Sequence, residues 1–301
     1  MLSSAYGINT SSIAQVQGGF SAKAFRVAAD KEYFLKVYDK SLPTIRGITE
    51  RMEVFMPALG CLSQIPTLNN RVLTPVPMLS GAYQLETEGH IYVLFHWIPG
   101  ETPGIETMTR AQTIELAEIL AALHSIQLDC KAPQEDISLS FLDELTYYLD
   151  HAILRPHACM FRAAIAETKK LRDTVRVNCD QLVLCHGDAH GNNVIQSAGG
   201  LVLVDFDGLH MAPAEADLFI YDWHPHGDAF LEAYTAARPG FQINWELLRY
   251  YILRRRLEDV WVDIQRLTEE SPDAAETQQL IAWVGQGIAA VGKILGEGEE
   301  R

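Results

Sequence analysis

Residues 186–207 read HGDAHGNNVIQSAGGLVLVDFD, and this stretch decides both the fold and the site. Two short apolar runs, residues 194–195 and residues 201–204, flank a small loop at residues 197–200 that contains two glycines. Apolar runs on either side of a compact, glycine-containing turn are typical of antiparallel strand pairs. The pattern therefore predicts a β-hairpin.

The register of this hairpin determines which polar side chains meet at its open end. Antiparallel pairing around the loop sets Gln196 opposite Leu201. Asn193 then lies opposite Val204 and beside Asp205. One amide and one carboxylate are therefore predicted at the same place.

A third oxygen-bearing side chain, Asp188, lies five residues before Asn193, close enough for a loop to bring it to the same place. Magnesium in nucleotide sites takes few oxygen ligands from protein and leaves room for water and phosphates. Phosphoryl transfer is catalysed mainly by positioning and by neutralisation of charge. The spacing from Asp188 to Asn193 to Asp205 follows in outline that of protein kinases. The stretch therefore predicts a kinase active site.

One difference from the protein-kinase motif narrows the choice of kinase family. Gly187 stands where they carry arginine, and His190 follows within the same loop. His-Gly-Asp-x-His-x-x-Asn followed by Asp-x-Asp resembles the aminoglycoside phosphotransferase and choline kinase superfamily of small-molecule kinases, over residues 18–263. The resemblance implies an α+β, protein-kinase-like, two-lobed fold. Its small antiparallel β N-lobe would span residues 1–98 and bind the nucleotide, and its larger, mainly helical C-lobe would span residues 99–301.

The resemblance also implies roles for individual residues of the C-lobe. Asp188 would be the catalytic carboxylate that orients or deprotonates the acceptor hydroxyl, and Asn193 and Asp205 would hold Mg²⁺. Residues expected to support them are His186, His190, Asp207 and Asp217. Of these, Asp217 would brace the catalytic loop, and the two histidines would hold it by hydrogen bonds without binding metal.

Two other interpretations of the motif are disfavoured. Residues 187–191 also spell the Gly-Asp-x-His-Gly opening of metallophosphoesterases, but the later Gly-Asp-x-x-Asp-Arg and Gly-Asn-His blocks of that family are absent from the sequence. The other alternative is a polar surface turn before an ordinary hairpin. This alternative would require three separate acid and amide side chains to occur by chance at the spacing found in kinases.

Upstream, residues 25–38 read as a second hairpin with Lys36 inside its second strand. A lysine in an alternating strand usually marks a solvated face, but the order of the motifs favours a phosphate-binding lysine, which needs an acid to hold it. Glu50 and Glu53 lie one turn apart in a predicted helix at residues 48–59, so they share a face. We favour Glu50 as the partner, with Glu53 as the alternative.

The remaining nucleotide contacts are expected from a glycine pair and a hinge strand. A glycine loop just before the hairpin can approach phosphate closely, although an ordinary turn is the alternative. An apolar strand at residues 90–97 resembles the family's hinge, where backbone groups bind the base of the nucleotide. We expect ATP as the nucleotide, and because the base is bound through backbone atoms, GTP remains an alternative. The residues expected to contact the nucleotide are Gly18, Gly19, Ser21, His96 and Ile98.

Charge and composition limit the classes of partner and the compartment that we expect for the protein. The net charge is −15, and residues 101–301 hold 16 basic against 32 acidic side chains. Nucleic acid is excluded as an expected partner, whereas a cationic small molecule would be attracted. Five cysteines without a Cys-x-x-Cys pair indicate a reducing cytoplasm. Without a leader or an apolar run of about 18 residues, neither export nor membrane insertion is expected.

The C-terminal part predicts helices. Thr109-x-x-Gln112 and Ser140-x-x-Asp143 have the pattern of capping boxes ahead of amphipathic helices. Further helices are predicted at residues 229–236, 245–267 and 277–295.

By resemblance, these helices form the acceptor pocket, and several of their residues are similar to the spectinomycin phosphotransferase branch. The acids expected to face the acceptor are Asp222, Glu258, Asp259 and Asp263, with a solvated helix face as the alternative. His224 and His226 are disfavoured as metal ligands because no third ligand is in view.

The expected activity is transfer of the γ-phosphoryl of ATP to a hydroxyl of a small, polar, cationic molecule such as an aminoglycoside or a spectinomycin-like antibiotic. Two alternatives stay open. One is a metabolic kinase of the same fold acting on choline, homoserine, methylthioribose or a sugar. The other is a catalytically silent nucleotide-binding protein. The sequence leaves the oligomeric state open.

Overall fold

The computed structural model describes residues 1–16, 21–127, 131–177 and 182–296. The chain divides into two compact units, one comprising Met1–Gln134 with Leu182–Gln242 and the other comprising Glu135–Gln181 with Ile243–Arg301. Residues 98 and 99, on either side of the predicted lobe boundary, both lie in the first unit. That boundary stays a prediction.

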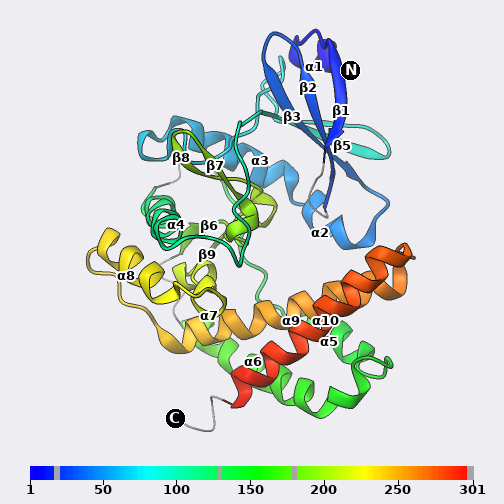
Figure 1. Cartoon of the computed structure of the whole chain (residues 1–301), viewed down its shortest axis with the longest axis vertical. Helices are drawn as coiled ribbons and strands as arrows, with labels where there is room; N and C mark the ends of the chain where they lie inside the picture. The colour runs from blue at the N-terminus through cyan, green and yellow to red at the C-terminus, as the bar shows by residue number, and fades with distance from the viewer. Residues whose placement is uncertain (17–20, 128–130, 178–181, 297–301) are drawn as a thin grey trace. The chain divides into compact units, whose positions relative to one another are not determined.

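The first unit begins with a five-stranded antiparallel sheet in the order β1-β2-β3-β5-β4 (Figure 1). Its strands are Ser12–Val16, Lys23–Ala28, Glu32–Asp39, His90–His96 and Gln84–Glu86. The short helix α1, Leu2–Tyr6, packs on it through an apolar cluster that includes Val27, Leu35 and Leu94. The predicted hairpin is confirmed, and it places Lys36 on the central strand β3, between Ala24 of β2 and Val93 of β5.

The helix predicted at residues 48–59 is instead two helices, α2 at Arg46–Thr49 and α3 at Met52–Cys61. The break has a local cause. The amide of Arg51 bonds to the carbonyl of Ile48 at 3.1 Å, while its Nε donates to the carbonyl of Gly47 at 2.8 Å. The side chain therefore takes the acceptor that a continuous helix would give to the backbone.

The second hairpin of the first unit confirms the predicted register. Strands β7, Val194–Ser197, and β8, Gly200–Leu203, pair with Gln196 opposite Leu201. The amide of Val204 donates to the carbonyl of Asn193 at 2.9 Å, which extends the pairing by one step to the metal-site candidates.

Helices surround this hairpin and complete the first unit. The capping box predicted at Thr109 and Gln112 is formed at the start of α4, Arg110–Leu123, which packs against α8, Gly227–Ala237. Other elements of this unit include β6 at Val183–Cys185, β9 at His210–Ala212, α7 at Ile220–Trp223, and the 3₁₀ turns η6 at Gly191–Asn193, η7 at Phe206–Gly208 and η8 at Ala214–Asp217. Strands β6 and β9 pair with each other.

The second unit is helical. It consists of α5 at Phe141–Tyr148, α6 at Ala158–Val177, α9 at Trp245–Glu269 and α10 at Ala274–Gly296. Helix α9 packs against the other three (Figure 1). The predicted cap at Ser140 is wrong, because Ser140 already has helical dihedral angles and its side chain makes no capping bond. None of the described helices is long and apolar enough to cross a membrane.

Helices α9 and α10 pack closely at one glycine of α10, Gly287, and a second glycine of the same helix, Gly285, provides a comparison. A Cβ at Gly287 would collide with Cγ2 of buried Val260, whereas a Cβ at Gly285 would meet nothing within 4 Å. Valine cannot easily move aside because its side chain is stiff. We therefore expect Gly287→Ala to lower the free energy of unfolding by about 1–3 kcal/mol.

The matched control is Gly285→Ala, which should raise the free energy of unfolding by about 0.5–1 kcal/mol because alanine favours the helix. Urea denaturation of both variants measures the difference. Equal effects of the two substitutions would contradict the close packing of Gly287 on Val260.

Candidate active site

The loop between β6 and β7 holds Asp188 in a fixed orientation. Nδ2 of Asn193 donates to the Asp188 backbone carbonyl and to its carboxylate Oδ2, both at 2.8 Å. Nε2 of His190 lies 3.3 Å from the other carboxylate oxygen, Oδ1. Because Nδ2 is identified by these two bonds, Oδ1 is the atom of Asn193 that can coordinate a cation. The predicted juxtaposition of Asp188 and Asn193 is thus observed.

Gly187 explains the departure from the protein-kinase motif. Its φ is +82°, and a Cβ there would lie 2.6 Å from the carbonyl oxygen of Gly208. An arginine, or any other side chain, would be strained in this left-handed conformation and would clash with that backbone. The glycine therefore lets the catalytic loop pack directly against η7.

Asp205 leaves the end of the hairpin in an unusual conformation. Its φ is +64° and its ψ is +63°, a left-handed geometry that residues other than glycine seldom adopt. Such conformations persist where the surrounding structure enforces them, often at functional sites. Here the surrounding contact is an ion pair, since Oδ1 of Asp205 lies 2.7 Å from Nζ of Lys36.

Lys36 is a buried cation between two acids. Its ammonium bonds to Asp205 at 2.7 Å and to Oδ2 of Asp207 at 3.0 Å, and its side chain is 7% exposed. Burial alone would lower the pKa of Lys36, but the charges of Asp205 and Asp207 raise it well above its ordinary value. The lysine is therefore charged.

The two acids differ in their surroundings. Burial raises the pKa of Asp205 above its ordinary value, because the charge of Lys36 does not fully offset it. Burial also disfavours the charged form of Asp207, but Lys36 and hydrogen bonds from Tyr38 and Ser21 hold its pKa below the ordinary value. Asp207 is therefore the more firmly ionised of the two.

The structure does not bring the predicted glutamates to the lysine. Glu50 is the C-terminal cap of α2 and Glu53 lies in the first turn of α3, and both are exposed. Among the residues that the structure describes, the carboxylates paired with Lys36 are Asp205 and Asp207. The expected sharing of one helix face by the glutamates fails because the helix breaks between them.

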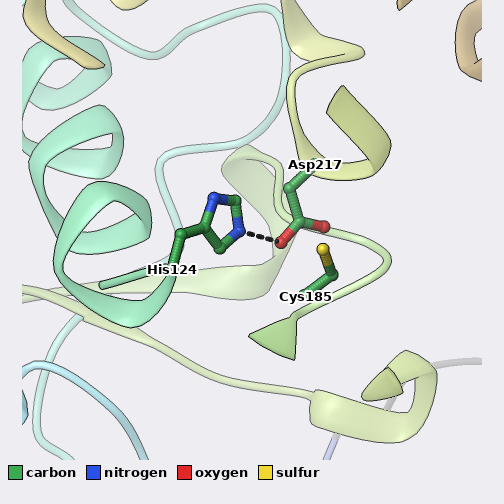
Figure 2. A group of neighbouring side chains, drawn as sticks. All are labelled: His124, Cys185 and Asp217. Atoms are coloured by element: carbon green, nitrogen blue, oxygen red, sulfur yellow. Dashed lines mark hydrogen bonds and ion pairs between the residues drawn. The ribbon is translucent and has the colours of Figure 1, made fainter. Parts of the chain in front are cut away.

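Asp217 contacts the loop between β6 and β7 through hydrogen bonds. Its carboxylate accepts hydrogen bonds from the amides of His186 and Gly187, each at 2.7 Å, and from Nε2 of His124 at 3.0 Å. Burial disfavours its charge, but these hydrogen bonds and the nearby histidines hold the pKa of Asp217 below its ordinary value. Figure 2 shows His124 pointing at this carboxylate from α4, with Cys185 alongside.

These three side chains have the composition of a metal site, and their donor atoms lie within 4.8 Å of one another. Their bonds indicate a different role. His124 Nδ1 lies 2.6 Å from the hydroxyl of Tyr234, and the Cys185 thiol donates to the carbonyl of Pro213 at 3.5 Å. With Asp217 bound to two amides, the group is a satisfied structural network of protein donors and acceptors.

His186 links the loop to the hairpin. Its Nδ1 accepts from the amide of Asp188 at 3.1 Å, so Nε2 carries the hydrogen and donates to the carbonyl of Val204 at 2.9 Å. Burial lowers the pKa of His186 despite the nearby charge of Asp217. The predicted supporting role of His186 is therefore observed in its neutral form.

The other nucleotide candidates lie in unit 1. Gly18 and Gly19 fall outside the described residues, whereas Ser21 donates to Oδ2 of Asp207 at 2.7 Å. His96 ends β5 with its ring stacked on Tyr33, and Ile98 follows it. Their roles in binding a nucleotide stay predictions.

The acceptor candidates are divided between the units. Asp222 lies in α7 of the first unit, while Glu258 and Asp259 lie in α9 of the second. Glu258 and Asp259 are each paired one turn away, with Arg254 and Arg255 respectively, at 2.8 Å. Asp263 is also in α9, and its pKa is raised to about 7 by burial and by the charge of Asp259.

Two residues of the site escaped the sequence analysis. Tyr38 donates to Oδ1 of Asp207 at 2.7 Å, and it could have been found because it lies two residues after Lys36 on the same strand face. His124 carried no comparable signal, because a histidine at the end of an amphipathic helix is ordinary. His224, disfavoured as a metal ligand, instead accepts from the amide of His226 at 3.1 Å.

The neutral state of His186 gives a pH prediction. Below about pH 6.5, the ordinary pKa of histidine, the unfolded chain takes up a proton that folded His186 does not. Stability should therefore fall on acidification, with His186 contributing up to about 1.4 kcal/mol per pH unit. Urea denaturation between pH 7.5 and pH 5.5 measures this slope.

His186→Gln should lower stability at neutral pH and flatten the slope. His157→Gln, at an exposed position, is the control and should keep the wild-type slope. A slope unchanged by His186→Gln would contradict the assignment of a neutral, buried imidazole.

Comparison with known proteins identifies the fold. A crystal structure of spectinomycin phosphotransferase with ADP and spectinomycin matches with a TM-score of 0.74 at 17% identity, covering 97% of this chain and 96% of that one. A microcompartment-associated aminopropanol kinase matches with a TM-score of 0.68 at 15% identity, covering 95% and 93%. A GDP and kanamycin complex of an aminoglycoside phosphotransferase matches with a TM-score of 0.65 at 12% identity, covering 99% and 97%.

The predicted α+β, kinase-like fold is therefore confirmed, and so is the resemblance. No curated protein matches the sequence. A family model described as the phosphotransferase enzyme family matches residues 12–251, which is well over half of the chain. The chain belongs to the phosphotransferase enzyme family.

Proposed function

We propose that the protein transfers the γ-phosphoryl group of ATP to a hydroxyl of a small polar molecule. The observation that carries the proposal is the arrangement within one compact unit: the Asn193 amide bonded to Asp188 and the Lys36 ammonium bonded to Asp205. These are the parts that phosphoryl transfer requires, namely a carboxylate for the hydroxyl, a cation for phosphate and oxygen ligands for metal.

The donor set fits magnesium. Asn193 offers Oδ1 and Asp205 offers a carboxylate, and both belong to the hard oxygen ligands that Mg²⁺ prefers. Bound by these two residues together with the nucleotide, Mg²⁺ supplies neutralisation of phosphate charge. The structure with AMP-PNP and Ca²⁺ of an amicoumacin kinase of similar fold, TM-score 0.62 at 13% identity, supports a nucleotide and a divalent cation together.

The chain's own residues then perform two tasks. Lys36 binds phosphate oxygens through its charged ammonium. Asp188 accepts a hydrogen bond from the acceptor hydroxyl and takes its proton as the bond between that oxygen and the γ-phosphorus forms. The bond from the γ-phosphorus to the β–γ bridging oxygen breaks in the same step, and ADP leaves. The hydrogen bonds from Asn193 hold the carboxylate in one orientation before the acceptor arrives, which reduces the cost of positioning.

For the acceptor, we propose an amine-bearing antibiotic of the aminoglycoside or spectinomycin kind, acted on in the cytoplasm. Two observations support it: the similarity in fold to a spectinomycin phosphotransferase and the excess of acidic side chains in residues 101–301, 32 against 16 basic. A metabolic amino alcohol is the second candidate, favoured by the similarity to an aminopropanol kinase.

The test is ADP release with Mg-ATP over a panel of spectinomycin, aminoglycosides, choline, aminopropanol, homoserine and methylthioribose. We expect one amine-bearing acceptor to stimulate release. Asp188→Asn should reduce kcat by about 10³-fold or more with less than about threefold change in ADP affinity, because the carboxylate acts on the acceptor.

Asp143→Asn is the matched control, since Asp143 is an exposed acid paired with Lys169. It should retain wild-type kcat. Turnover retained by Asp188→Asn would contradict the role of Asp188, and release stimulated only by metabolites would assign the protein to metabolism.

A further inference from the structure

Asp207 joins three separate segments of the first unit. Its Oδ1 accepts from the hydroxyl of Tyr38 at 2.7 Å. Its Oδ2 accepts from Ser21 at 2.7 Å and from the ammonium of Lys36 at 3.0 Å. The side chains of Lys36 and Asp207 are 7% and 13% exposed, so these bonds lie largely out of water.

A buried ammonium requires a carboxylate that stays with it, because an unpaired charge in this position is very costly. Asp205 also touches Lys36, but it belongs to the proposed metal site, where its oxygens would be shared with a cation. Asp207 has no such competing role. Three donors hold its carboxylate, which orients it toward the lysine.

We propose that Asp207 is the positioning carboxylate of Lys36, and that Tyr38 orients Asp207 for this task. The inference rests on the proposed function, in which Lys36 binds phosphate. It gives Asp207 the role that the sequence assigned to Glu50 or Glu53, both of which are exposed.

Tyr38 is placed to act through Asp207. It lies two residues after Lys36 on β3, so both side chains project from the same face of the strand. It is fully buried, and its hydroxyl donates to the acid. By occupying Oδ1, this bond leaves Oδ2 for Lys36 and for Ser21. Loss of the hydroxyl would let the carboxylate turn away from the ammonium.

Ser21 connects the Asp207 carboxylate to the segment that is predicted to bind the nucleotide phosphates. It is the last residue of residues 16–21, where the sequence predicts a loop over the phosphates. Its bond to Oδ2 of Asp207 connects it to the acid that holds Lys36. One carboxylate thus sets the position of both the lysine and Ser21.

A double-mutant cycle tests the inference, since residues that act through one another give non-additive effects. Tyr38→Phe removes only a hydroxyl. We expect it to raise the KM for ATP and the Kd for ADP by about fivefold, with a smaller change in kcat. In Lys36→Met and Asp207→Asn backgrounds, the same substitution should change the Kd for ADP by less than about 1.5-fold.

Tyr33→Phe is the matched control, because Tyr33 is also buried on β3 but bonds only weakly, at 3.4 Å, to Asp30. It should leave both constants unchanged. An equal effect of Tyr38→Phe with and without Lys36 would overturn the inference, because Tyr38 would then act independently of the lysine.

Glu50→Gln is the discriminating variant. We expect a smaller effect on ADP affinity than that of Asp207→Asn, and a larger, non-additive effect with Lys36→Met would give the role to Glu50 and overturn the inference. The ADP titration separates this result from the proposed function: coupling in ADP binding without transfer to any acceptor would support the role of Asp207 while contradicting the proposed reaction.

Discussion

The burial of one positive charge organises the nucleotide side of this protein. The Lys36 ammonium lies inside the first unit and is held by carboxylates of Asp205 and Asp207, which come from the end of the second hairpin. Charges removed from water are tolerated only when paired with good geometry and further hydrogen bonds. Strand β3, Ser21 and η7 must therefore lie close together. The left-handed backbone of Asp205 is part of this arrangement.

A second buried acid organises the loop between β6 and β7, which carries Asp188. Asp217 binds the amides of His186 and Gly187, and Gly187 in turn lets the loop lie against the backbone of Gly208. The hydrogen bonds continue from Asp217 through His124 to Tyr234, which accepts from Arg238 at 2.6 Å. Such fully satisfied polar networks fix one conformation of a core. The network thereby holds the two residues that directly precede Asp188.

Much of this could be predicted from sequence because it depends on short-range patterns. The pairing of Gln196 with Leu201, and hence the position of Asn193 opposite Val204, follows from alternation and turn length. The position of Lys36 in the second strand of a hairpin follows from the same kind of pattern. The capping box at Thr109 was likewise readable, since its two partners lie within four residues.

Where the structure differs from the sequence predictions, the difference comes from interactions that short sequence patterns do not reveal. The break between α2 and α3 depends on a side chain, Arg51, taking a backbone acceptor. The sequence predicts the acid that pairs with Lys36 on that helix, whereas in the structure Lys36 pairs with Asp205 and Asp207, which lie 169 and 171 residues away. The network around His124 joins residues about 90 to 110 positions apart, and no short sequence pattern predicts such long-range contacts.

The most direct test of the account is to follow the γ-phosphate itself. The protein is incubated with Mg-ATP and the acceptor that stimulates ADP release, and the products are observed by ³¹P nuclear magnetic resonance. The account predicts that the γ-phosphate signal is replaced, mole for mole, by a phosphomonoester on the acceptor. Its replacement by inorganic phosphate alone would mean that water is the acceptor and would contradict the assignment as a small-molecule kinase.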